Sequence, residues 1–425
     1  MSRIITAGAG PYAGFTNASL QRAVDDVAAA GGGVVEVPAG VYRMRDALHL
    51  RSGVRVIGEP GATLLKEPSV TVPLLDYLGY GHYEFTVTEP DRLQVGMGVH
   101  ITDDDSMGFY DTVATIVERR GDLFFIDRML NHDYWPAKRG RVTTIFPIVD
   151  AIGVEDVALE NIIIDGNPDE TQRLNGCRGG GVFLLMACRA RVENVEVRHF
   201  NGDAISFQQC VDVIVRGCHV HHNAGGGIHP GSGSVRYWLR RNHAHDNGAC
   251  GVFYCLRTTH SICEDNRLER NGEAGISIGE RDTDHWIRNN IIADNGGYGV
   301  EFRAPIAHGG DRARIEGNTL AGNGRCVSPP ALPAEIHIPA GLRDVLIAGN
   351  TFQPAPDSHA LLIDAGCPGV GVRGNQIHGR SQGDGFPTRE GDFPDVGPAA
   401  LPLDGARHLN IERLDAVERS TFWAG

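Results

Sequence analysis

The stretch Asn242-His-Ala-His-Asp-Asn247-Gly-Ala-Cys-Gly-Val252 recurs 24 positions later as Asn266-Arg-Leu-Glu-Arg-Asn271-Gly-Glu-Ala-Gly-Ile276, and again as Asn290-Ile-Ile-Ala-Asp-Asn295-Gly-Gly-Tyr-Gly-Val300. Every copy holds two asparagines five positions apart, followed by an aliphatic residue directly after a glycine. Related marks continue on both sides of these copies, at Ile205, Ile228, Asn318, Asn323, Asn350 and Asn375. A fixed period of this length indicates a repeat architecture.

Between these marks, apolar and polar residues alternate in two-residue steps, as in residues 191–197, 211–216 and 260–265. This alternation is the periodicity of strands. Strands this short cannot each bury a face alone, so successive coils must stack on one another. Asparagines at equivalent turns can then hydrogen-bond along the stack and tolerate a left-handed backbone. The sequence therefore predicts an all-β fold, a parallel β-helix with about 24 residues per coil.

Composition narrows the class of protein. Glycine accounts for 56 of 425 residues, which favours tight turns and excludes a chain dominated by long helices. The length alone would suggest about two to three domains. There are 39 Lys and Arg against 53 Asp and Glu, and the resulting net charge of −14 argues against nucleic acid as a partner. All but two of the cations, Lys66 and Lys138, are arginines, whose guanidinium groups bind carboxylates in bidentate fashion.

The chain shows no sign of a membrane segment or of a disulfide framework. The longest apolar stretch, Val182 to Cys188, is too short to span a bilayer, so no membrane partner is expected. The start, Met1 to Ile5, lacks the apolar region of a secretory signal, so we expect a cytoplasmic chain, or a secreted or periplasmic one if a signal was trimmed. The nine cysteines lack paired spacing and are interpreted as reduced core residues.

The repeat and its flanks predict four regions. Residues 1–78 hold a short amphipathic helix over 17–33, which caps the solenoid, and the first coils. Residues 79–147 lose the 24-residue rhythm and form an inserted β subdomain, residues 148–378 form the main β-helix, and residues 379–425 form a C-terminal tail. The insert is rich in aromatic residues, which either stack on sugars or fill a small core. They are Tyr80, Tyr83, Phe109, Tyr110, Tyr134 and Trp135.

Two segments resemble a known superfamily. Residues 17–58, with the helix followed by Gly-Gly-Gly-Val-Val-Glu-Val-Pro-Ala-Gly-Val-Tyr, resemble the entry of pectate-lyase-like right-handed parallel β-helices. Residues 201–220 are similar to the polygalacturonase pattern, on which Asp203 matches the first catalytic aspartate. The paired aspartates of that family fall on Gly225 and Gly226, and its histidine position is taken by Cys250. The resemblance implies a right-handed solenoid that cleaves or modifies polysaccharides on one face.

The repeat also places side chains on that face. The aliphatic residue after the glycine points inward, so the residues one and three positions later point outward. The first of these positions carries Ser206, His229, Phe253, Ser277 and Glu301, and the second carries Gln208, Gly231, Cys255, Gly279 and Arg303. Arg257, Glu280 and Arg281 follow where the strand meets its loop. We expect this strip to gather ionisable groups within four coils, a stretch of roughly 15 Å.

Three functions remain open. Hydrolysis of a glycosidic bond needs two carboxyl groups, for which the candidates are Asp203, Glu280 and Glu301, and His229 is the fourth catalytic candidate. An ideal ladder would separate Glu280 from Glu301 by about 11 Å. A polyuronate lyase or C5-epimerase would instead use His229 and the arginines as base and cation. A non-catalytic glycan-binding β-helix is the third alternative.

A second set of residues is expected to bind the substrate. The candidates are Tyr254, Arg257, Arg281, Asp282, Trp286 and Arg303. The arginines favour an acidic, uronate-like sugar, because a guanidinium matches a carboxylate. The repeat puts Tyr254 at an inward position, which speaks against its contact with a sugar.

No cofactor is required by these chemistries, and we assign no metal ligand. The histidines His219, His221, His243 and His245 form a two-by-two patch on adjacent coils, which could bind a transition metal but more often is a solvated ladder. The acidic segments 103–105 and 280–284 could hold Ca²⁺ through oxygen ligands. The expected partners are a polysaccharide or oligosaccharide and, for an assembly, further copies of the chain as a homo-oligomer such as a trimer.

Overall fold

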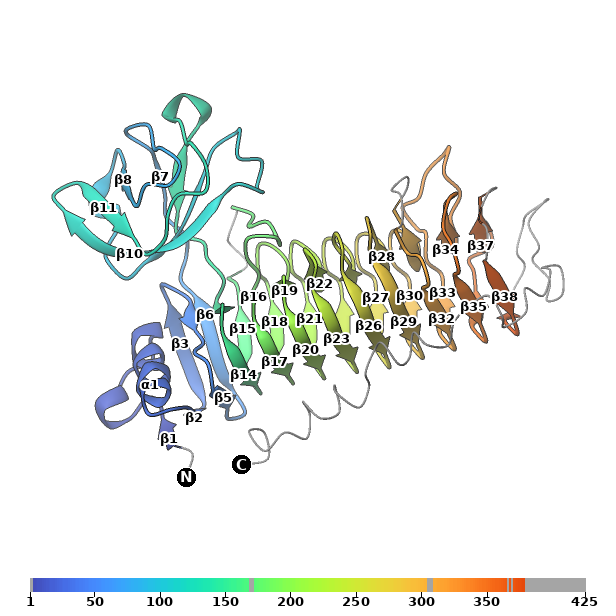
Figure 1. The fold of residues 1–425 in the computed structure, drawn as a ribbon, viewed down its shortest axis with the longest axis horizontal. Coiled ribbons are helices and arrows are strands. Elements are labelled where there is room, and N and C mark those ends of the chain that lie inside the picture. Colours follow the sequence, from blue (N-terminus) through green and yellow to red (C-terminus); the bar gives the residue numbers. More distant parts are fainter. Residues whose placement is uncertain (1–2, 168–171, 304–308, 365–366, 368–369, 379–425) are drawn as a thin grey trace.

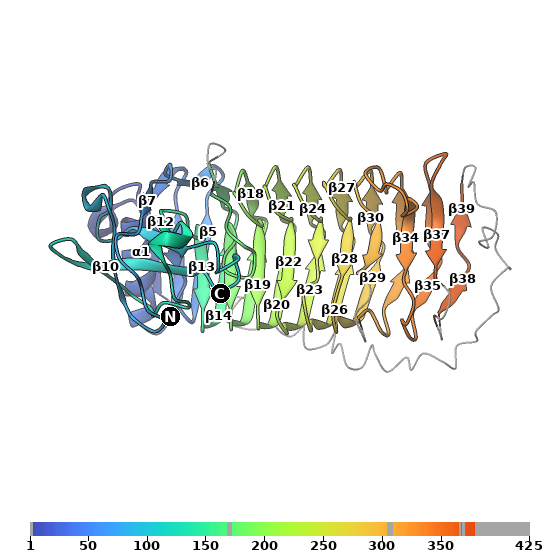
Figure 2. The same cartoon turned by 90° about the horizontal axis from the view of Figure 1, so that it is seen from above.

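The computed structural model describes residues 3–167, 172–303, 309–364, 367 and 370–378. The chain winds into an elongated right-handed parallel β-helix whose coils stack along one axis (Figures 1 and 2). Three parallel sheets, called sheets 1, 2 and 3 below, run the length of the stack because each coil contributes one strand to each sheet. This confirms the solenoid predicted from the 24-residue repeat. The predicted tail, residues 379–425, lies outside the described residues.

The sheets are ordered along the stack. Sheet 1 consists of β1 (Arg3–Thr6), β2 (Gly33–Val37), β5 (Val54–Gly58), β14 (Glu155–Glu160), β17 (Cys188–Glu193), β20 (Val211–Arg216), β23 (Val235–Arg240), β26 (Thr259–Glu264), β29 (Thr283–Arg288), β32 (Arg314–Glu316), β35 (Leu346–Ala348) and β38 (Gly371–Arg373). Sheet 2 consists of β4 (Leu48–His49), β13 (Val149–Ile152), β16 (Val182–Leu185), β19 (Ile205–Gln208), β22 (Ile228–Gly231), β25 (Val252–Phe253), β28 (Ile276–Ile278), β31 (Val300–Phe302), β34 (Ala334–Ile338) and β37 (His359–Ile363). Sheet 3 consists of β3 (Gly40–Met44), β6 (Ala62–Lys66), β15 (Ile163–Asp165), β18 (Glu196–Arg198), β21 (His219–His221), β24 (His243–His245), β27 (Arg267–Glu269), β30 (Ile291–Ala293), β33 (Thr319–Ala321), β36 (Thr351–Gln353) and β39 (Gln376–Ile377).

Two asparagine ladders hold the coils in register. In the first ladder, Asn266 Oδ1 accepts hydrogen bonds from the backbone N–H of Asn242 at 2.9 Å and from its side-chain amide at 3.0 Å. The amide of Asn266 donates in turn to the Leu239 carbonyl and to Asn290 Oδ1, both at 2.9 Å. The same pattern repeats along Asn290, Asn318, Asn350 and Asn375, and along Asn223, Asn247, Asn271, Asn295 and Asn323. These hydrogen bonds explain the spacing of asparagines in the sequence.

A single α-helix covers the first coils, as the sequence predicts. Helix α1 (Asn17–Ala29) begins at the N-cap Thr16, which forms a capping box with Ser19. Its buried side chains are Ser19, Leu20, Ala23, Val24 and Val27, and the helix packs on sheet 1 at one end of the solenoid (Figure 1). Because this face covers the open core of the terminal coil, the helix removes apolar surface from water there.

The insert is an antiparallel subdomain with its own core, and it already includes Thr71–Pro73, ahead of the predicted start at residue 79. Its six strands lie in the order β7 (Thr71–Pro73), β12 (Arg141–Thr143), β9 (Gly98–Thr102), β10 (Thr112–Arg120), β11 (Leu123–Ile126) and β8 (Glu84–Thr86). Short 3₁₀ turns stand at Pro90–Arg92 and Pro136–Lys138 in this subdomain, and a third, Gly10–Tyr12, precedes α1. Of the aromatic residues noted in the sequence, Tyr134 is buried, whereas Tyr80, Tyr83, Phe109, Tyr110 and Trp135 are exposed. The subdomain stands beside the first coils (Figure 1).

Candidate functional site

The outward face of sheet 2 carries two rows of side chains along the solenoid. Inward residues such as Val252 and Ile276 are fully buried in the core, and the residue after each points outward. The parallel register aligns the first row as Asp150, Phe183, Ser206, His229, Phe253, Ser277, Glu301 and His337. The second row includes Gln208, Gly231 and Cys255. This is the strip expected from the repeat.

Asp203 and His229 form a buried ion pair on this face. The Nδ1 atom of His229 donates to Asp203 Oδ2 at 2.6 Å, and the other carboxylate oxygen accepts from the backbone N–H of Gly226 at 2.6 Å. Burial alone would lower the pKa of His229, but its contacts with Asp203 and with the sulfur of Cys255 outweigh burial and raise that pKa to about 9. Burial would raise the pKa of Asp203, but the histidine keeps it below its usual value. Both residues are among the catalytic candidates from the sequence.

A segment of the chain covers this pair, which explains why an outward residue such as His229 is only 3% exposed. Residues 174–178, called the covering segment below, bring Gly176 so close that a Cβ atom on it would stand 1.8 Å from Asp203 Oδ2. The carbonyl of Gly176 accepts a hydrogen bond from Ser206 Oγ at 2.6 Å. Arg178 Nε donates to the carbonyl of Phe109 in the insert. The insert therefore helps to hold the covering segment on the strip.

Two thiols converge on the same histidine. Cys177 belongs to the covering segment and Cys255 to the coil after His229, and one donor atom from each of the three residues lies within 4.8 Å of the others. The contact between the thiols lowers the pKa of Cys177, whereas that contact and burial raise the pKa of Cys255. All nine cysteines, each within the described residues, are free. No signal in the sequence pointed to this cluster, because the two cysteines lie far apart in the chain without a recognised spacing.

Further along the strip, Arg303 is fixed over Phe253. Its guanidinium lies 4.2 Å from the centre of the Phe253 ring and donates to Ser277 Oγ at 2.7 Å and to the Tyr254 carbonyl at 2.6 Å. Ser277 Oγ donates in turn to a carboxylate oxygen of Glu301 at 3.2 Å. We call Phe253, Ser277, Glu301 and Arg303 the Arg303 network. All four come from three consecutive coils, and Arg303 and Glu301 remain partly accessible to solvent.

Glu273 is a carboxylate of this face that the sequence interpretation missed. It is exposed on the turn before β28, and its Oε2 accepts from the Cys250 thiol at 3.4 Å. Burial raises the pKa of Cys250 well above its usual value, and the charges of Glu273 and Glu301 add to that effect. The two carboxylates thus act on one thiol beside the strip. The position of Glu273, three residues before an inward aliphatic residue, could have drawn attention to it.

The remaining candidates of the strip lie on exposed turns. Glu280 and Arg281 form an exposed ion pair at 2.8 Å on the turn after β28, and Arg257 is exposed on the equivalent turn one coil earlier. The catalytic roles predicted for Asp203, His229, Glu280 and Glu301 stay predictions.

Three of the predicted substrate-binding side chains are not on the open strip. Tyr254 points inward and is fully buried, stacked on the His285 ring at 4.3 Å between centres. Asp282 is fully buried, and the backbone N–H groups of Thr258 and Gly279 donate hydrogen bonds to its carboxylate. Trp286 belongs to β29 in sheet 1, where it packs against Arg288 at 3.9 Å. These placements correct the sequence-based assignment. The repeat already indicated an inward Tyr254, but it leaves open the direction of residues beyond the strand.

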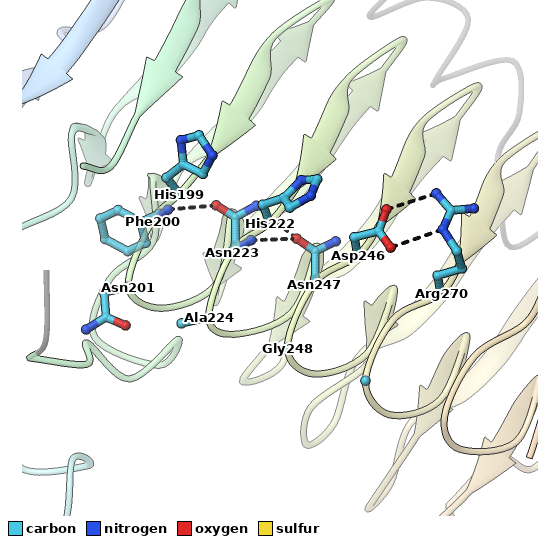
Figure 3. Close-up of a pocket in the computed structure, with 11 residues that line it drawn as sticks. His199, Phe200, Asn201, His222, Asn223, Ala224, Asp246, Asn247, Gly248 and Arg270 are labelled. Carbon is cyan, nitrogen blue, oxygen red and sulfur yellow. Dashed lines mark hydrogen bonds and ion pairs between the residues drawn. The ribbon is translucent and has the colours of Figure 1, made fainter. Parts of the chain in front are cut away.

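Sheet 3 bears the predicted histidine patch beside a shallow groove. The Nε2 atoms of His219 and His245 lie 2.7 Å apart, and His243 stacks on His219. Burial and the neighbouring imidazoles lower the pKa of His221 to about 4. The groove has a volume of about 530 Å³ and follows the asparagine turns, where Asp246 faces Arg270 (Figure 3). Its lining is His199, Phe200, Asn201, His222, Asn223, Ala224, Asp246, Asn247, Gly248, Arg270 and Gly272.

The two acidic segments considered for Ca²⁺ have their carboxylates engaged by the protein. In the first segment, Asp103 accepts from the backbone N–H of Trp135, and Asp104 and Asp105 pair with Arg139 and Lys138. In the second segment, Glu280 pairs with Arg281, and Asp284 pairs with Arg312 at 2.6 Å. These contacts give both segments a structural role in holding loops.

Comparisons with known proteins agree with the fold. A family model described as "Right handed beta helix region" matches residues 149–262. A search of curated proteins by sequence finds no significant match. The A-module of an Azotobacter vinelandii mannuronan C-5 epimerase is similar at 15% identity with a TM-score of 0.51, over 86% of this chain and 96% of the module. The Dettilon tailspike protein matches at 13% identity with a TM-score of 0.53, over 88% of this chain and 62% of the tailspike.

A protein of Geobacillus virus E2 matches at 12% identity with a TM-score of 0.54, over 85% of this chain and 58% of that chain. The chain thus spans less than two thirds of both viral proteins. Among the described residues, no helix has the length and apolar character needed to cross a membrane. With its three parallel sheets, its capping helix and these matches, the chain is a right-handed parallel β-helix of the pectate-lyase-like fold.

Proposed function

We propose that the protein binds a uronate-containing polysaccharide along the outward face of sheet 2 and hydrolyses its glycosidic bonds. The observation that carries the proposal is the Arg303 network, in which a guanidinium, a hydroxyl and a carboxylate are fixed side by side on a partly exposed strip. A guanidinium has five N–H donors, and the hydrogen bonds to Ser277 and Tyr254 leave donors for a sugar carboxylate.

Glu301 is the first of the two carboxyl groups that hydrolysis needs. Its hydrogen bond from Ser277 fixes its orientation next to the proposed uronate receptor, Arg303. For the second group we favour Glu273, because its carboxylate is exposed and contacts Cys250 beside the strip. Glu280 is the alternative second carboxyl group that the sequence suggested. We use it as the comparison for Glu273, since its carboxylate is held by Arg281.

Elimination at a uronate is the second candidate, because a cation that neutralises the sugar carboxylate serves that reaction equally well. The fixed position of Arg303, which donates to the Tyr254 carbonyl, favours elimination as well. The similarity to a mannuronan epimerase module is one of fold, and it motivates mannuronan as a first polymer to try, with polygalacturonate as the second. A neutral glucan serves as the control polymer.

The test measures products and binding separately. New reducing ends without ultraviolet absorbance support hydrolysis, absorbance of unsaturated ends supports elimination, and binding without either product supports a glycan-binding protein. We expect Glu301→Gln and Glu273→Gln to lower the rate of cleavage by about 100-fold or more. Glu280→Gln should remain close to wild type. Loss of activity in Glu280→Gln with full activity in Glu273→Gln would overturn the choice of the second carboxylate.

The uronate preference is tested at Arg303. We expect Arg303→Gln to weaken binding of polyuronates by about 10-fold, the loss of roughly 1.4 kcal/mol from one charge-assisted contact, while leaving the neutral glucan unaffected. Arg22→Gln, an exposed substitution on α1 at the end of the solenoid, is the matched control. Equal affinity of wild type and Arg303→Gln for polyuronates would contradict the assignment of this receptor.

A further inference from the structure

The cluster formed by Cys177, His229 and Cys255 has the composition of a metal site. It offers two sulfur atoms and one imidazole nitrogen, all within 4.8 Å of one another. A tetrahedral zinc ion has Zn–S bonds of about 2.3 Å and Zn–N bonds of about 2.0 Å, so donor atoms around it stand a little under 4 Å apart. A small inward movement of the three side chains would therefore meet that geometry.

Two buried polar atoms at this place lack a hydrogen-bond partner within the described part of the chain. One is Nε2 of His229, the nitrogen that Asp203 does not occupy. The other is Oε1 of Gln208, a residue that is 2% exposed. The Gln208 amide lies over Gly231, where a Cβ atom would come within 2.3 Å of Oε1. Because buried polar atoms without partners are costly, a cation that takes the place of the Nε2 proton and contacts Oε1 would remove that cost.

Asp203 supplies the support that metal-binding histidines commonly have. Its carboxylate accepts from Nδ1 of His229 at 2.6 Å, which holds the proton on Nδ1 and makes Nε2 the nitrogen that binds an ion, in exchange for the proton it carries in the ion pair. Cys177 comes from the covering segment, whereas His229 and Cys255 come from adjacent coils of sheet 2. Gly231 stands two residues after His229 and is paired with Cys255. Because it has no side chain, nothing from this position separates His229 from Cys255.

We propose that Cys177, His229 and Cys255 bind a zinc-class transition metal ion, with Asp203 orienting the histidine and the unpartnered Gln208 Oε1 as the candidate for a fourth position. Thiolate and imidazole ligands select zinc over calcium or magnesium, which prefer oxygen. The ion would fasten the covering segment to the solenoid. This proposal is independent of the proposed hydrolysis, because it uses none of the residues of the Arg303 network. It gives Asp203 and His229 a role in metal binding in place of the catalytic one considered from the sequence.

The test adds Co²⁺ to the reduced, metal-free full-length chain and records absorbance. We expect a thiolate-to-cobalt charge-transfer band together with the d–d bands of tetrahedral cobalt, both displaced by one equivalent of Zn²⁺. Cys177→Ser and Cys255→Ser should each reduce the charge-transfer band and weaken Zn²⁺ binding, and His229→Gln should weaken binding as well. Asp203→Asn should weaken binding by about 10- to 100-fold with the band retained, since it acts through the histidine.

Two control variants distinguish this cluster from other places on the protein where cobalt could bind. Cys326→Ser changes an exposed cysteine elsewhere and should leave the band unchanged. His245→Gln removes a histidine of the sheet 3 patch, where bound cobalt would give no thiolate band. Circular dichroism establishes that each variant is folded. Absence of the charge-transfer band in the reduced wild type, or equal Zn²⁺ affinity in wild type and Cys177→Ser, would overturn the proposal. So would a Cys177–Cys255 disulfide that forms equally fast with and without Zn²⁺.

Discussion

The Oδ2 atom of Asp203 lies 2.6 Å from Nδ1 of His229, although the two residues are 26 positions apart in the sequence. The pair bridges two adjacent coils, and the second oxygen of the carboxylate is held by the N–H of Gly226 at 2.6 Å. Because both oxygens are engaged, the imidazole ring is held with Nε2 directed away from the carboxylate. Any chemistry of this histidine, with a metal or with a substrate, therefore takes place at Nε2.

The contact of the covering segment with this pair can be tested at Gly176. A Cβ atom there would stand 1.8 Å from Asp203 Oδ2 and 2.4 Å from His229 Nδ1, so Gly176→Ala must displace residues 174–178. We expect the thiols of Cys177 and Cys255 to react with a disulfide reagent several-fold faster in this variant, as measured by absorbance of the released thiolate. Gly121→Asn, on the hairpin turn of the insert, should react at the wild-type rate. Unchanged thiol reactivity in Gly176→Ala would contradict the described packing.

The asparagine ladder makes a strong prediction about stability. Asn266→Ala removes the acceptor for the N–H and the amide of Asn242 and the donor to the Leu239 carbonyl, all of which are buried. Leaving such groups without partners should lower the free energy of unfolding by about 3 kcal/mol, measured by denaturant titration. Asn289→Gly, at an exposed turn residue with a left-handed backbone, is the control and should cost far less. A loss equal to that of the control would show that the ladder contributes little.

Glu335 occupies the place in the second ladder where the next asparagine would stand. It is fully buried and accepts from the Asn323 amide at 2.5 Å, and burial raises its pKa to about 7. Because the folded state holds this proton more tightly than the unfolded state, stability is lost as pH rises from the usual carboxyl pKa toward 7. Glu335→Gln should therefore raise the free energy of unfolding by about 1–3 kcal/mol at pH 8 and by little at pH 4. The comparison of denaturation curves at the two pH values checks this, and a variant less stable than wild type at pH 8 would refute it.

His49 forms a second charged cluster where the insert meets the solenoid. Its ring contacts Asp150 of β13 at 2.8 Å and Asp46 at 3.5 Å, and Thr115 of the insert donates to Asp46. Burial would lower the pKa of His49, but the two carboxylates raise it to about 10. Its stabilising contribution is thus fully present below about pH 6.5 and is lost as pH rises toward 10. Asp150→Asn should cost about 3 kcal/mol of unfolding free energy at pH 6 and less near pH 10. An equal cost at both pH values would exclude this pairing as the cause.

The sequence predicted those features that repeat from coil to coil. The spacing of Asn242, Asn266 and Asn290 predicts the ladder because each position has the same environment in every coil. The outward placement of His229 and Glu301 followed from the same register. Repetition averages out local irregularity, so a single period was enough to assign the fold and the strip.

The features that occur once were not predictable in this way. The covering segment belongs to no repeat, so neither the burial of His229 nor the approach of Cys177 could be inferred from spacing. A coil has three faces, and the period does not state on which face a residue far from the glycine mark will lie, so the place of Trp286 on sheet 1 could not be read from the sequence. Tertiary contacts between a non-repeating loop and the solenoid require the coordinates.

Each coil pairs only with the coil before it and the coil after it, so the solenoid can gain or lose a coil without a change elsewhere. A duplicate of residues 242–265 would carry its own asparagines and glycines, so the ladders could continue through it without a break. The Cys177–His229–Cys255 cluster, in contrast, depends on one coil directly following another. Gain or loss of a coil beyond Cys255 would preserve the cluster, whereas a coil added between His229 and Cys255 would separate its members by a further ~4.8 Å. The Arg303 network likewise depends on three consecutive coils, so the number of coils is free to drift only beyond Arg303.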